Sequence, residues 1–488
     1  MTEHNISLAP LKDLVDGELV DVPAVGDWLQ DPNTGADLQQ MAVTPDATVE
    51  RALAAAARVH TSGSWSSLSA QERAGWLMRL GDAVEAKAME SARLEALTTG
   101  ATISTTAMLS FITHIAWKAA AMTLGSGWGS QVVDGEKGQP VEVLRLPWGP
   151  TALLVPWNAP APMAAHKAAS ALAAGAPAIL KPSEYAPNGS GVIAEAAAEI
   201  GLPAGVLQVL HGGPHTGGML VTDERIRSVS FTGGLEGGRA IASACAPDFK
   251  PTQLELGGNN PVIVLPDADL DDAALGVEML MTQLNGQWCR ALGRLLVHES
   301  VKDELLQRVE ARFAKLVIGH SLSADSQMGP IIHSNHLAGL HTRIDALVAA
   351  GGTAHAWTPL PEGPGNFLSP TLVTGASSQD ALHEMFGPVG TVHTFRTDDE
   401  AVALANATPY GLEGYVFGAD EDRAMAVGRR VRSGGIKING ATMLSLSMAA
   451  PRPAWGWSGF ADEGTVESIN FFCGTRVVGV EGMRSEGI

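Results

Sequence analysis

Two residues in this chain could together carry out covalent chemistry on a carbonyl group. Cys289 ends the stretch NGQWC at 285–289, and Glu255 lies earlier in the chain, in LELGGNN at 254–260. A thiolate attacks a carbonyl carbon well, and a nearby carboxylate can activate the water that later removes the acyl group. The pair therefore indicates acyl transfer through a thioester. From these residues alone two alternatives stay open: Cys289 could be a packed core thiol, and Glu255 could simply end a strand.

Five further motifs accompany this pair in a characteristic order. PWNAP at 156–160, AILKPSE at 178–184 and SFTGG at 230–234 precede it, and EMFGPVG at 384–390 and PYGLEGYVFG at 409–418 follow it. With these motifs the chain resembles the NAD(P)-dependent aldehyde dehydrogenase superfamily from about residue 25 to about residue 480. The resemblance implies an aldehyde-dehydrogenase-like fold and an enzyme that oxidises an aldehyde to a carboxylic acid.

The resemblance also assigns catalytic roles to four residues. Cys289 attacks the aldehyde to form a thiohemiacetal, a hydride passes to NAD, and water activated by Glu255 hydrolyses the resulting thioester. The side-chain amide of Asn158 and the backbone N–H of Cys289 stabilise the oxyanion, an effect of up to a few kcal/mol. Lys167 matches a lysine near the site. The alternative for Asn158 is an ordinary residue of a turn.

A glycine-rich turn after an apolar run indicates where a phosphate could bind. Gly233, Gly234, Gly237 and Gly238 in FTGGLEGG would let a helix N-terminus approach a pyrophosphate closely. The spacing differs from G-x-G-x-x-G, so a purely structural turn is the alternative. The resembled family has a serine at the position of Gly234, which places one phosphate contact in doubt.

Lys181 and Glu184 match the positions that bind the adenine ribose in the resembled family. A carboxylate there accepts from a 2′-hydroxyl and repels a 2′-phosphate, which favours NAD over NADP. The alternative is an i, i+3 surface pair. Glu384 and Phe386 resemble the pair that holds the nicotinamide ribose and ring. The implied cofactor-binding residues are Val155, Pro156, Trp157, Lys181, Ser183, Glu184, Gly213, Phe231, Thr232, Gly233, Gly234, Gly238, Leu256, Glu384 and Phe386; we predict no metal site.

Four residues are expected to line the aldehyde pocket: Met163, His166, Trp288 and Arg452. His166 and Arg452 stand where many family members carry an aromatic residue, and Trp288 precedes the nucleophile. A pocket lined by Trp288 suits a planar or apolar aldehyde, whereas Arg452 and His166 could meet an oxygen or a carboxylate. The alternatives are that Trp288 only packs in the wall and that Arg452 points to solvent.

Two other positions depart from the resembled family. Leu284 stands where the family commonly has an asparagine, so we expect altered local packing without loss of activity. Cys473 lies where many relatives have a polar or acidic residue, so a supporting role for such a residue is not carried over.

Length and composition limit the function classes. With 488 residues, of which 45% are hydrophobic and 17% charged, the chain can bury a large core and should form two or three domains. A net charge of −20 argues against nucleic acid or an anionic membrane as a partner. Three cysteines without CxxC spacing favour a reducing compartment, with the cytoplasm as the default. We find no signal peptide and expect no apolar run near the ~20 residues that span a bilayer.

The order of expected elements predicts an α/β fold. Residues 46–98 have the periodicity of two amphipathic helices, and strand-like and helix-like segments then alternate, as in βαβ units with parallel strands. We predict a Rossmann-type NAD-binding domain at 1–128 and 148–256 and a second α/β catalytic domain at 257–456. A small β bridging element at 129–147 and 457–488, with a hairpin near 130–149, should pair subunits into a homodimer or homotetramer.

Two alternative functions remain open at this point. A CoA-acylating relative would pass the thioester to a thiol, but such enzymes generally lack the glutamate at the position of Glu255. A catalytically silent NAD-binding scaffold of the same fold has no need for Cys289, Glu255 and Asn158 together. The sequence therefore favours the hydrolytic NAD-dependent enzyme with a small-molecule aldehyde as substrate.

Overall fold

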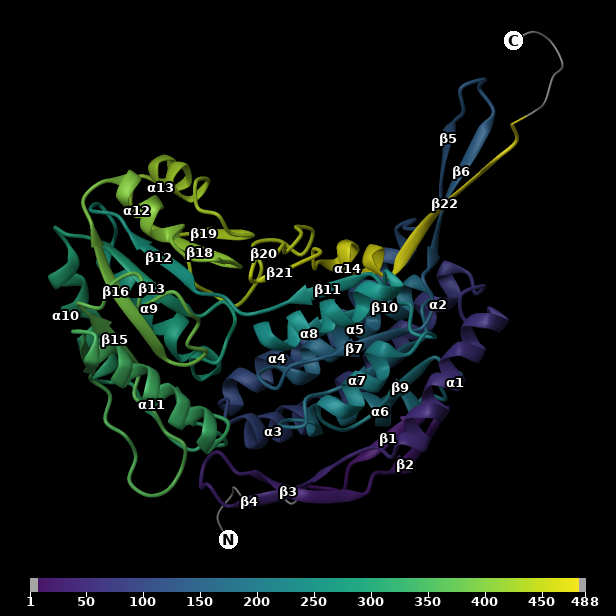
Figure 1. Cartoon of the computed structure of the whole chain (residues 1–488), viewed down its shortest axis with the longest axis horizontal. Coiled ribbons are helices and arrows are strands. Elements are labelled where there is room, and N and C mark those ends of the chain that lie inside the picture. The colour runs from purple at the N-terminus through teal and green to yellow at the C-terminus, as the bar shows by residue number, and fades with distance from the viewer. Residues whose placement is uncertain (1–7, 482–488) are drawn as a thin grey trace.

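Two large β-sheets with helices on their faces make up most of the molecule (Figure 1). The computed structural model describes residues 8–481. The first sheet consists of β1 (Lys12–Val15), β2 (Glu18–Asp21), β7 (Thr151–Leu154), β8 (Ala178–Lys181), β9 (Leu207–Val209), β10 (Ser228–Thr232), β11 (Thr252–Glu255) and β21 (Gly459–Phe460). Their order is β2-β1-β9-β8-β7-β10-β11-β21; the five strands from β9 to β11 are parallel, and β1 and β21 pair antiparallel at the two sides.

Helices cover both faces of the first sheet, so its central strands are buried and apolar on both sides. An outer layer of α2, α3 and α4 packs against α5 and α6. The helices of this part are α1 (Asp46–Ser62), α2 (Ala70–Ala86), α3 (Ala88–Thr99), α4 (Ile103–Gly125), α5 (Pro160–Ala174), α6 (Asn188–Glu199), α7 (Pro214–Thr222), α8 (Leu235–Cys245), the short η1 (Ala246–Asp248) and α14 (Thr465–Phe471).

The second sheet is built on the same plan. It consists of β12 (Asn260–Val264), β13 (Leu292–His298), β14 (Thr353–Ala356), β15 (Thr371–Thr374), β16 (Val389–Phe395), β18 (Glu413–Phe417) and β19 (Gly435–Ile438). The order is β14-β15-β16-β13-β12-β18-β19, parallel except for β14. Successive residues of β12 enter different cores: Val262 and Val264 join one cluster, and Ile263 and Leu265 join another. The two sheets confirm the predicted α/β class.

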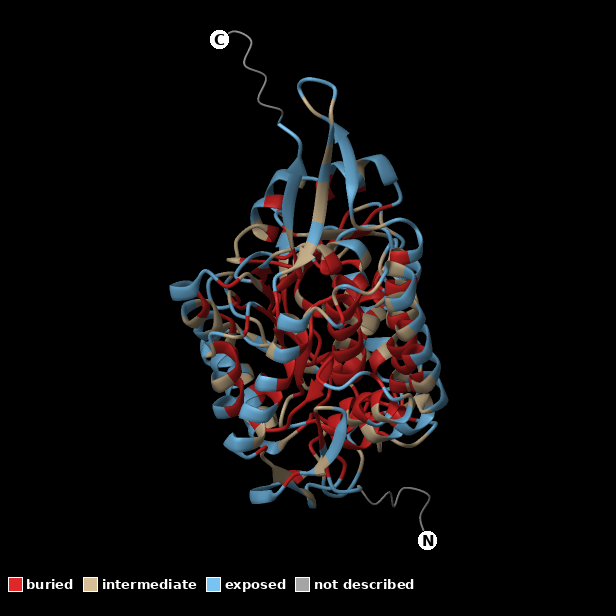
Figure 2. Cartoon of the chain, turned by 90° about the vertical axis from the view of Figure 1, so that its right-hand side faces the viewer, coloured by how far each residue is buried: buried red, intermediate tan, exposed pale blue. Residues whose placement is uncertain are grey.

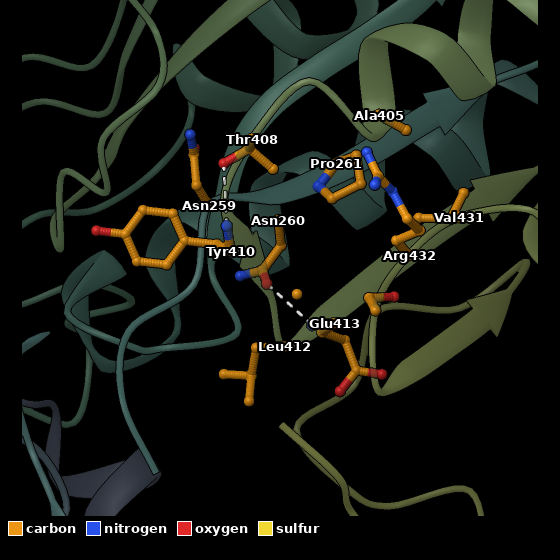
Figure 3. Close-up of a pocket in the computed structure, with 12 residues that line it drawn as sticks. Asn259, Asn260, Pro261, Ala405, Thr408, Tyr410, Leu412, Glu413, Val431 and Arg432 are labelled. Carbon is orange, nitrogen blue, oxygen red and sulfur yellow. Dashed lines mark hydrogen bonds between the residues drawn. The ribbon is translucent and has the colours of Figure 1, made fainter. Parts of the chain in front are cut away.

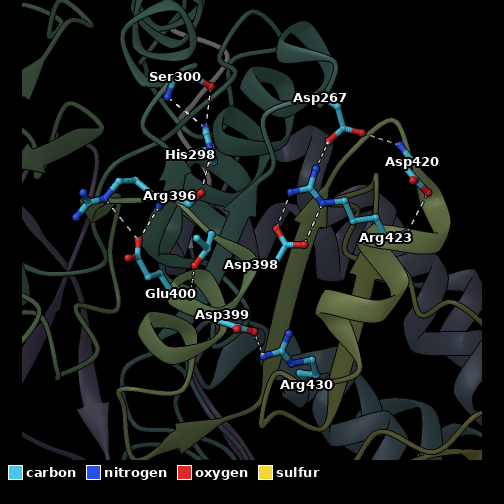
Figure 4. A network of polar contacts seen from close by, with 11 residues as sticks. Asp267, His298, Ser300, Arg396, Asp398, Asp399, Glu400, Asp420, Arg423 and Arg430 are labelled. Carbon is cyan, nitrogen blue, oxygen red and sulfur yellow. Dashed lines mark hydrogen bonds and ion pairs between the residues drawn. The ribbon is translucent and has the colours of Figure 1, made fainter.

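The helices of the second part are α9 (Leu270–Thr282), η2 (Gln283–Gly286), α10 (Lys302–Phe313), α11 (Ser334–Ala349), α12 (Asp398–Ala405) and α13 (Glu421–Gly428). Figure 4 shows ion pairs that connect α12 and α13 at the surface, with Arg423 between Asp267 and Asp398 and Arg430 beside Asp399. Such exposed pairs each contribute little to stability, about 0–1 kcal/mol. None of the predicted site residues belongs to this network.

Three small β elements complete the fold. An arm of β5 (Gln131–Asp134), β6 (Pro140–Pro147) and β22 (Cys473–Gly479) projects from the body and is mostly exposed (Figures 1 and 2). The other two elements are the pairs β3 (Ala24–Gln30) with β4 (Asp37–Ala42) and β17 (Tyr410–Gly411) with β20 (Trp455–Gly456). The expected hairpin and final strand are thus present. However, β21 and α14, which fall within the predicted bridging range 457–488, pair with β11 and pack on α5; the domain division stays a prediction.

Helix α4 corrects the expectation that no apolar run reaches the length of a membrane span. It has 23 residues and is long and apolar enough to cross a membrane by length and composition. Trp117, Ala120, Ala121 and Leu124 are nevertheless buried in the core of the first part, where α4 packs against α2 and α5. The apolar composition of α4 is therefore used in helix packing.

The region 46–98 also differs from the expected two helices. The structure has three, because α2 ends at Lys87, whose backbone leaves the helical region at φ −103° and ψ 9°, and α3 begins directly afterwards. Ser69 and Glu72 form a capping box that fixes the start of α2. This layer supports α5, which follows the PWNAP motif.

Candidate functional site

The reaction centre lies where the chain passes from the first sheet to the second. Glu255 is the last residue of β11, Asn260 is the first of β12, and residues 256–259 form the crossover between them. The Asn260 amide donates to the Cys289 carbonyl over 2.9 Å. A Cβ atom on Gly258 would lie only 2.4 Å from the Cys289 carbonyl oxygen, so a glycine is needed for this approach. The structure thus brings the LELGGNN motif against the turn that carries the predicted nucleophile.

The loop before Cys289, residues 284–289, is held in an unusual backbone conformation. Leu284 and Asn285 both have left-handed φ angles, 49° and 57°. The buried Asn285 side chain donates to the carbonyls of Gly100 and Pro330 over 2.8 and 2.9 Å and accepts from the N–H of Gly329 over 2.8 Å. Three long-range hydrogen bonds therefore hold this nucleophile loop. Leu284, which stands where the resembled family commonly has an asparagine, is buried in the core of the second part.

Asn158 lies beside the nucleophile loop. Its amide donates to the Gln287 carbonyl over 2.9 Å, which leaves the second amide N–H for another acceptor. Within residues 8–481 the backbone N–H of Cys289 has no hydrogen-bond acceptor. The buried Glu95 of α3 supports this side, because it accepts from the Ala161 N–H in the first turn of α5 over 2.6 Å. Asn158 and the Cys289 N–H can therefore serve as a pair of donors for a developing oxyanion.

The burial of Cys289 favours the protonated form of its thiol. Burial raises the pKa of Cys289 to about 12, and the Arg290 guanidinium opposes this rise only in part. Arg290 is engaged in an ion pair with the buried Glu413. The Tyr415 hydroxyl fixes the same turn by donating to the Arg290 carbonyl over 2.8 Å. A nearby base must therefore accept the thiol proton before Cys289 can attack.

Glu255 has the properties of such a base. Burial and the neighbouring Glu463 carboxylate raise the pKa of Glu255 well above its usual value. Its Oε1 atom is buried and has no hydrogen-bond partner within the described chain. The Glu255 charge contributes to the raised pKa of Cys289, after burial and the Glu384 charge. A buried carboxylate of raised basicity within electrostatic range of a thiol suits both proton removal and water activation.

A second carboxylate, Glu463, was not predicted from the sequence. It is buried, and its Oε1 lies 3.0 Å from the Nζ of Lys167, which also donates to Ser230 over 2.8 Å. Burial alone would raise the pKa of Glu463, but Lys167 and Arg452 outweigh that effect and lower it. Lys167 lies in the Ala-rich α5, so the sequence indicates that its buried charge needs an anionic partner, but it does not identify Glu463 as that partner. Cys473, the first residue of β22, is buried, and its Sγ lies 3.8 Å from the Ala174 carbonyl oxygen.

The predicted pocket residues His166 and Arg452 lie together. The Arg452 Nη2 atom is 3.4 Å from His166 Nε2 and 3.6 Å from Glu463 Oε2, and His166 Nε2 is 2.9 Å from the Ser468 hydroxyl. Burial lowers the pKa of His166 to about 4, so its ring is neutral near pH 7. The Arg452 side chain stays 28% exposed. This cluster therefore presents a cation that solvent can reach.

The two apolar pocket candidates differ in exposure. Trp288 is only 8% exposed and packs in the core of the second part. Met163 is half-buried and contacts the cores of both parts. Trp288 thus belongs mainly to the packing of the wall.

The glycine turn, residues 233–238, is shaped mainly by side chains of the protein. A Cβ atom on Gly233 or Gly237 would lie 2.4 or 2.9 Å from the Phe231 ring, and one on Gly238 would lie 2.6 Å from the Leu256 side chain. Only Gly234 faces open space. Gly234 precedes α8 without a side-chain cap, so the first N–H groups of α8 are available to an anion. This open, uncapped helix start fits a pyrophosphate.

The Lys181 and Glu184 pair lies at the end of β8. Lys181 is buried and donates to the carbonyls of Gly212 and Pro182 over 2.5 and 3.0 Å, and its Nζ is 3.8 Å from Glu184 Oε2. Burial lowers the pKa of Lys181, and Glu184 opposes this. Glu184 remains partly exposed above Gly213. The two residues form a pair, but Lys181 is buried and Glu184 is only partly exposed, so the pair does not lie on an open surface.

The remaining cofactor candidates gather at the same edge of the first sheet and across from it. Trp157 follows β7, and its ring meets the Phe386 ring edge-on at a centroid distance of 5.2 Å. Burial raises the pKa of Glu384 to about 8, although its carboxylate accepts from the Gly258 N–H over 2.9 Å. The others lie at strand ends: Val155 and Pro156 after β7, Ser183 after β8, Gly213 after β9, Thr232 at the end of β10 and Leu256 after β11. Ligands of parallel α/β sheets bind at such ends.

A small pocket in the second part lies next to Asn260 and contains none of the predicted site residues (Figure 3). The Asn260 side-chain oxygen Oδ1 accepts from the Glu413 N–H over 3.1 Å, while the side-chain amide nitrogen donates to the carbonyls of Cys289 and Ala291. The pocket therefore belongs to the support of the nucleophile turn. It is lined by Asn259, Asn260, Pro261, Ala405, Thr408, Tyr410, Gly411, Leu412, Glu413, Val431, Arg432 and Ser433.

The cysteines form no disulfide within the described residues. Cys245, Cys289 and Cys473 are all free thiols. Between residues 8 and 481, no group of three His, Cys, Asp or Glu side chains is placed to hold a metal ion.

Comparison with known proteins gives one consistent result. The family model described as "Aldehyde dehydrogenase family" matches residues 29–478. A succinate-semialdehyde dehydrogenase of Paenarthrobacter nicotinovorans is 34% identical, covering 90% of this chain and 98% of the relative. An NAD-dependent aldehyde dehydrogenase structure from Sinorhizobium meliloti has a TM-score of 0.93 and 30% identity, covering 98% of this chain and 96% of that one. A betaine aldehyde dehydrogenase of Staphylococcus aureus in complex with NAD+ has a TM-score of 0.92 and 29% identity, covering 98% and 97%.

Proposed function

The chain belongs to the aldehyde dehydrogenase family and oxidises an aldehyde with NAD, and we propose that Cys289, Glu255 and Asn158 carry out the reaction. The observation that carries this assignment is their convergence at the crossover between the sheets. There the buried Glu255 influences the Cys289 thiol, and Asn158 lies against the nucleophile loop.

The geometry supports a defined role for each group. Glu255 accepts the Cys289 proton, and the thiolate attacks the aldehyde carbon to form a thiohemiacetal. The Asn158 amide and the Cys289 N–H donate to the oxyanion as it develops. NAD, held by Lys181, Glu184, the α8 N-terminus and Glu384, supplies the hydride acceptor when bound.

Deacylation uses the same base. After the proton taken from Cys289 has passed to solvent, Glu255 takes a proton from water, and the resulting hydroxide attacks the thioester carbon. The tetrahedral intermediate then releases the carboxylic acid, and the departing Cys289 thiolate takes back the proton held by Glu255. Glu463 raises the basicity of Glu255 through charge repulsion, while Lys167 compensates the buried Glu463 charge. The presence of a carboxylate base supports hydrolysis of the thioester to a carboxylic acid, because transfer of the acyl group to CoA does not require this base.

Glu184 supports NAD as the preferred cofactor over NADP. Its carboxylate lies beside Gly213 and the Lys181 ammonium and is partly exposed. A 2′-phosphate at this place would meet the negative charge of Glu184. A 2′-hydroxyl would instead find an acceptor.

Arg452 and His166 support an aldehyde with an anionic or oxygen-rich tail. Lys167 and Arg452 bring two positive charges to a cluster in which Glu463 supplies one negative charge. Only the Nη2 atom of Arg452 has a side-chain partner within residues 8–481, so further guanidinium donors can face a substrate. The relative named succinate-semialdehyde dehydrogenase is consistent with this substrate class.

The substrate proposal has a direct test. Arg452→Met should lower kcat/KM for a semialdehyde with a terminal carboxylate by about tenfold or more, since a charge-assisted hydrogen bond from the Arg452 guanidinium to that carboxylate is lost. The rate with an uncharged aldehyde of the same length should change much less. Equal losses for both aldehydes would refute the role of Arg452 as an anion contact.

The choice among the three candidate functions rests on product formation. Initial NADH production is measured with aliphatic, aromatic and semialdehyde substrates, with and without CoA, and with Cys289→Ala as the control. The proposal expects a CoA-independent rate that disappears in the variant. A rate that requires CoA would support the acylating alternative, and NAD binding without turnover of any aldehyde would support the silent scaffold.

The assembly and location of the protein also remain proposals. The exposed arm of β5, β6 and β22 carries Val132, Val477 and Val478 at its surface, which supports pairing into a homodimer or homotetramer. The free thiols are consistent with a reducing compartment such as the cytoplasm.

A further inference from the structure

Two side chains of α11 hold the backbone of the segment 384–386. The His336 Nε2 atom is 2.8 Å from the Phe386 carbonyl oxygen, and the Arg343 Nη1 atom is 2.6 and 3.3 Å from the carbonyl oxygens of Glu384 and Met385. His336 and Arg343 lie two helical turns apart and so share one face of α11. Because a carbonyl oxygen can only accept, His336 carries its proton on Nε2. Three consecutive carbonyl groups are thus bound from a single helix.

The segment needs such support because its backbone is strained. Phe386 has a left-handed φ of 54°, which for a bulky residue costs on the order of 1–2 kcal/mol. A residue keeps such a conformation only when its surroundings enforce it. The hydrogen bonds from His336 and Arg343 act on both sides of this position.

The same segment contacts the crossover between the sheets and the loop after β7. The Glu384 carboxylate accepts from the Gly258 N–H over 2.9 Å, and a Cβ atom on Gly257 would collide with it. The Trp157 ring meets both the Phe386 ring and the His336 ring edge-on, at 5.2 and 5.7 Å. The place of α11 therefore determines how Glu384 and Phe386 approach the crossover next to Cys289.

We propose that His336 and Arg343 are positioning residues that hold the Glu384–Phe386 segment in place for the nicotinamide end of the cofactor. The inference rests on the proposed function, since it concerns the same reaction centre. His336 and Arg343 touch neither Cys289 nor Glu255 and act only through the three carbonyls.

Two chemical readouts separate this role from a general structural one. Hydrolysis of 4-nitrophenyl acetate without NAD needs only the thiol, the base and the oxyanion donors, since no hydride is transferred. NAD binding to the protein without substrate is followed by quenching of tryptophan fluorescence, because Trp157 contacts the segment. The variants are His336→Leu and Arg343→Met, the conservative His336→Gln and Arg343→Lys, and His341→Leu as a control at an exposed position of α11.

The expected result is selective. His336→Leu and Arg343→Met should weaken NAD binding and lower the kcat of aldehyde oxidation by about tenfold to a hundredfold, because a small displacement of reacting groups has effects of this size. Ester hydrolysis should stay within about twofold of the wild type. His336→Gln, which keeps an N–H donor, should recover most of the binding, and His341→Leu should behave as wild type.

Three outcomes would overturn the inference. NAD affinity and kcat unchanged in both variants would show that the two side chains do not position the segment. Equal loss of ester hydrolysis and NAD binding would show a general loss of structure, as would failure of His336→Gln to recover binding. If the wild type itself lacks ester hydrolysis that depends on Cys289, the proposed function fails instead, independently of α11.

Discussion

The reaction centre and the glycine turn are organised in opposite ways. Around Cys289, buried side chains bond to groups from distant parts of the chain, as Asn285 does with the backbone carbonyls of Gly100 and Pro330. At Gly234 the helix start has no side-chain cap and faces open space. The reaction centre is thus preorganised by long-range contacts, whereas the cofactor turn keeps donors free for a ligand. Substitutions in the two regions should therefore have different consequences.

The largest effect should come from breaking the charge compensation at the reaction centre. Lys167→Met leaves Glu463 buried without its ammonium partner, which should lower the free energy of unfolding by about 3–5 kcal/mol. The variant should also lose most of its kcat, because an altered Glu463 changes the basicity of Glu255. Urea denaturation and steady-state kinetics measure the two effects. Recovery of stability in Lys167→Met with Glu463→Gln is expected, and its absence would contradict the pairing.

Asn285→Ala tests whether the nucleophile loop depends on its long-range hydrogen bonds. Three buried backbone groups lose their hydrogen-bond partner, and alanine suits the left-handed φ of this position less well than asparagine does. The free energy of unfolding should therefore fall by about 3 kcal/mol. The kcat should fall as well. Asn439→Ala is the matched control. Asn439, which follows β19, also has a left-handed φ, and its side chain forms hydrogen bonds with the backbone of Gly418. If both variants kept wild-type kcat, the loop would not be positioned in this way.

Glu95→Gln examines the support of α5 through pH. Burial raises the pKa of Glu95 to about 7, above its ordinary value of 4.5. The folded state therefore favours the protonated carboxyl, and the wild type loses stability as pH rises from 4.5 towards 7. Glutamine does not titrate and still accepts from Ala161. From pH 5 to pH 8, the free energy of unfolding of the variant relative to that of the wild type should rise by on the order of 2 kcal/mol in denaturation experiments. A difference that does not change with pH would contradict the raised pKa of Glu95.

The smallest effect should appear on the cofactor side. Glu184→Gln removes the charge that repels a 2′-phosphate, so kcat/KM with NADP relative to NAD should rise by about tenfold, or about 1.4 kcal/mol. The free energy of unfolding should change little, because Glu184 is partly exposed. An unchanged ratio, or equal efficiency with both cofactors in the wild type, would remove Glu184 from the discrimination.

The local motifs could be predicted from the sequence, and the contacts between distant segments could not. PWNAP, AILKPSE and SFTGG follow apolar runs, and the ends of parallel strands meet at one edge, so their grouping follows from the pattern. Glu463, which pairs with Lys167, and His336, which binds the Phe386 carbonyl, have no local signal because their partners are distant in the sequence.

Some sequence patterns fit more than one physical cause. A Cβ atom on Gly233 or Gly237 would meet the Phe231 ring, so packing against this ring and approach to a phosphate both suit a glycine there, and the phosphate role stays a prediction. Helix α4 has the length and hydropathy of a membrane span; one face packs against α2, α3 and α5, while Phe111 and Met122 are exposed. In both cases the composition indicates a local property, while the neighbouring segments are defined only by the fold.

The most direct test of the central claim is the pre-steady-state reaction of Glu255→Gln with NAD and a good aldehyde. If Glu255 activates the deacylating water, the variant should form close to one NADH per Cys289 in a burst and then turn over very slowly. Quenched samples should contain a thioester on Cys289, visible by mass spectrometry. A steady-state rate equal to that of the wild type would contradict the role of Glu255 as the base that releases the acid.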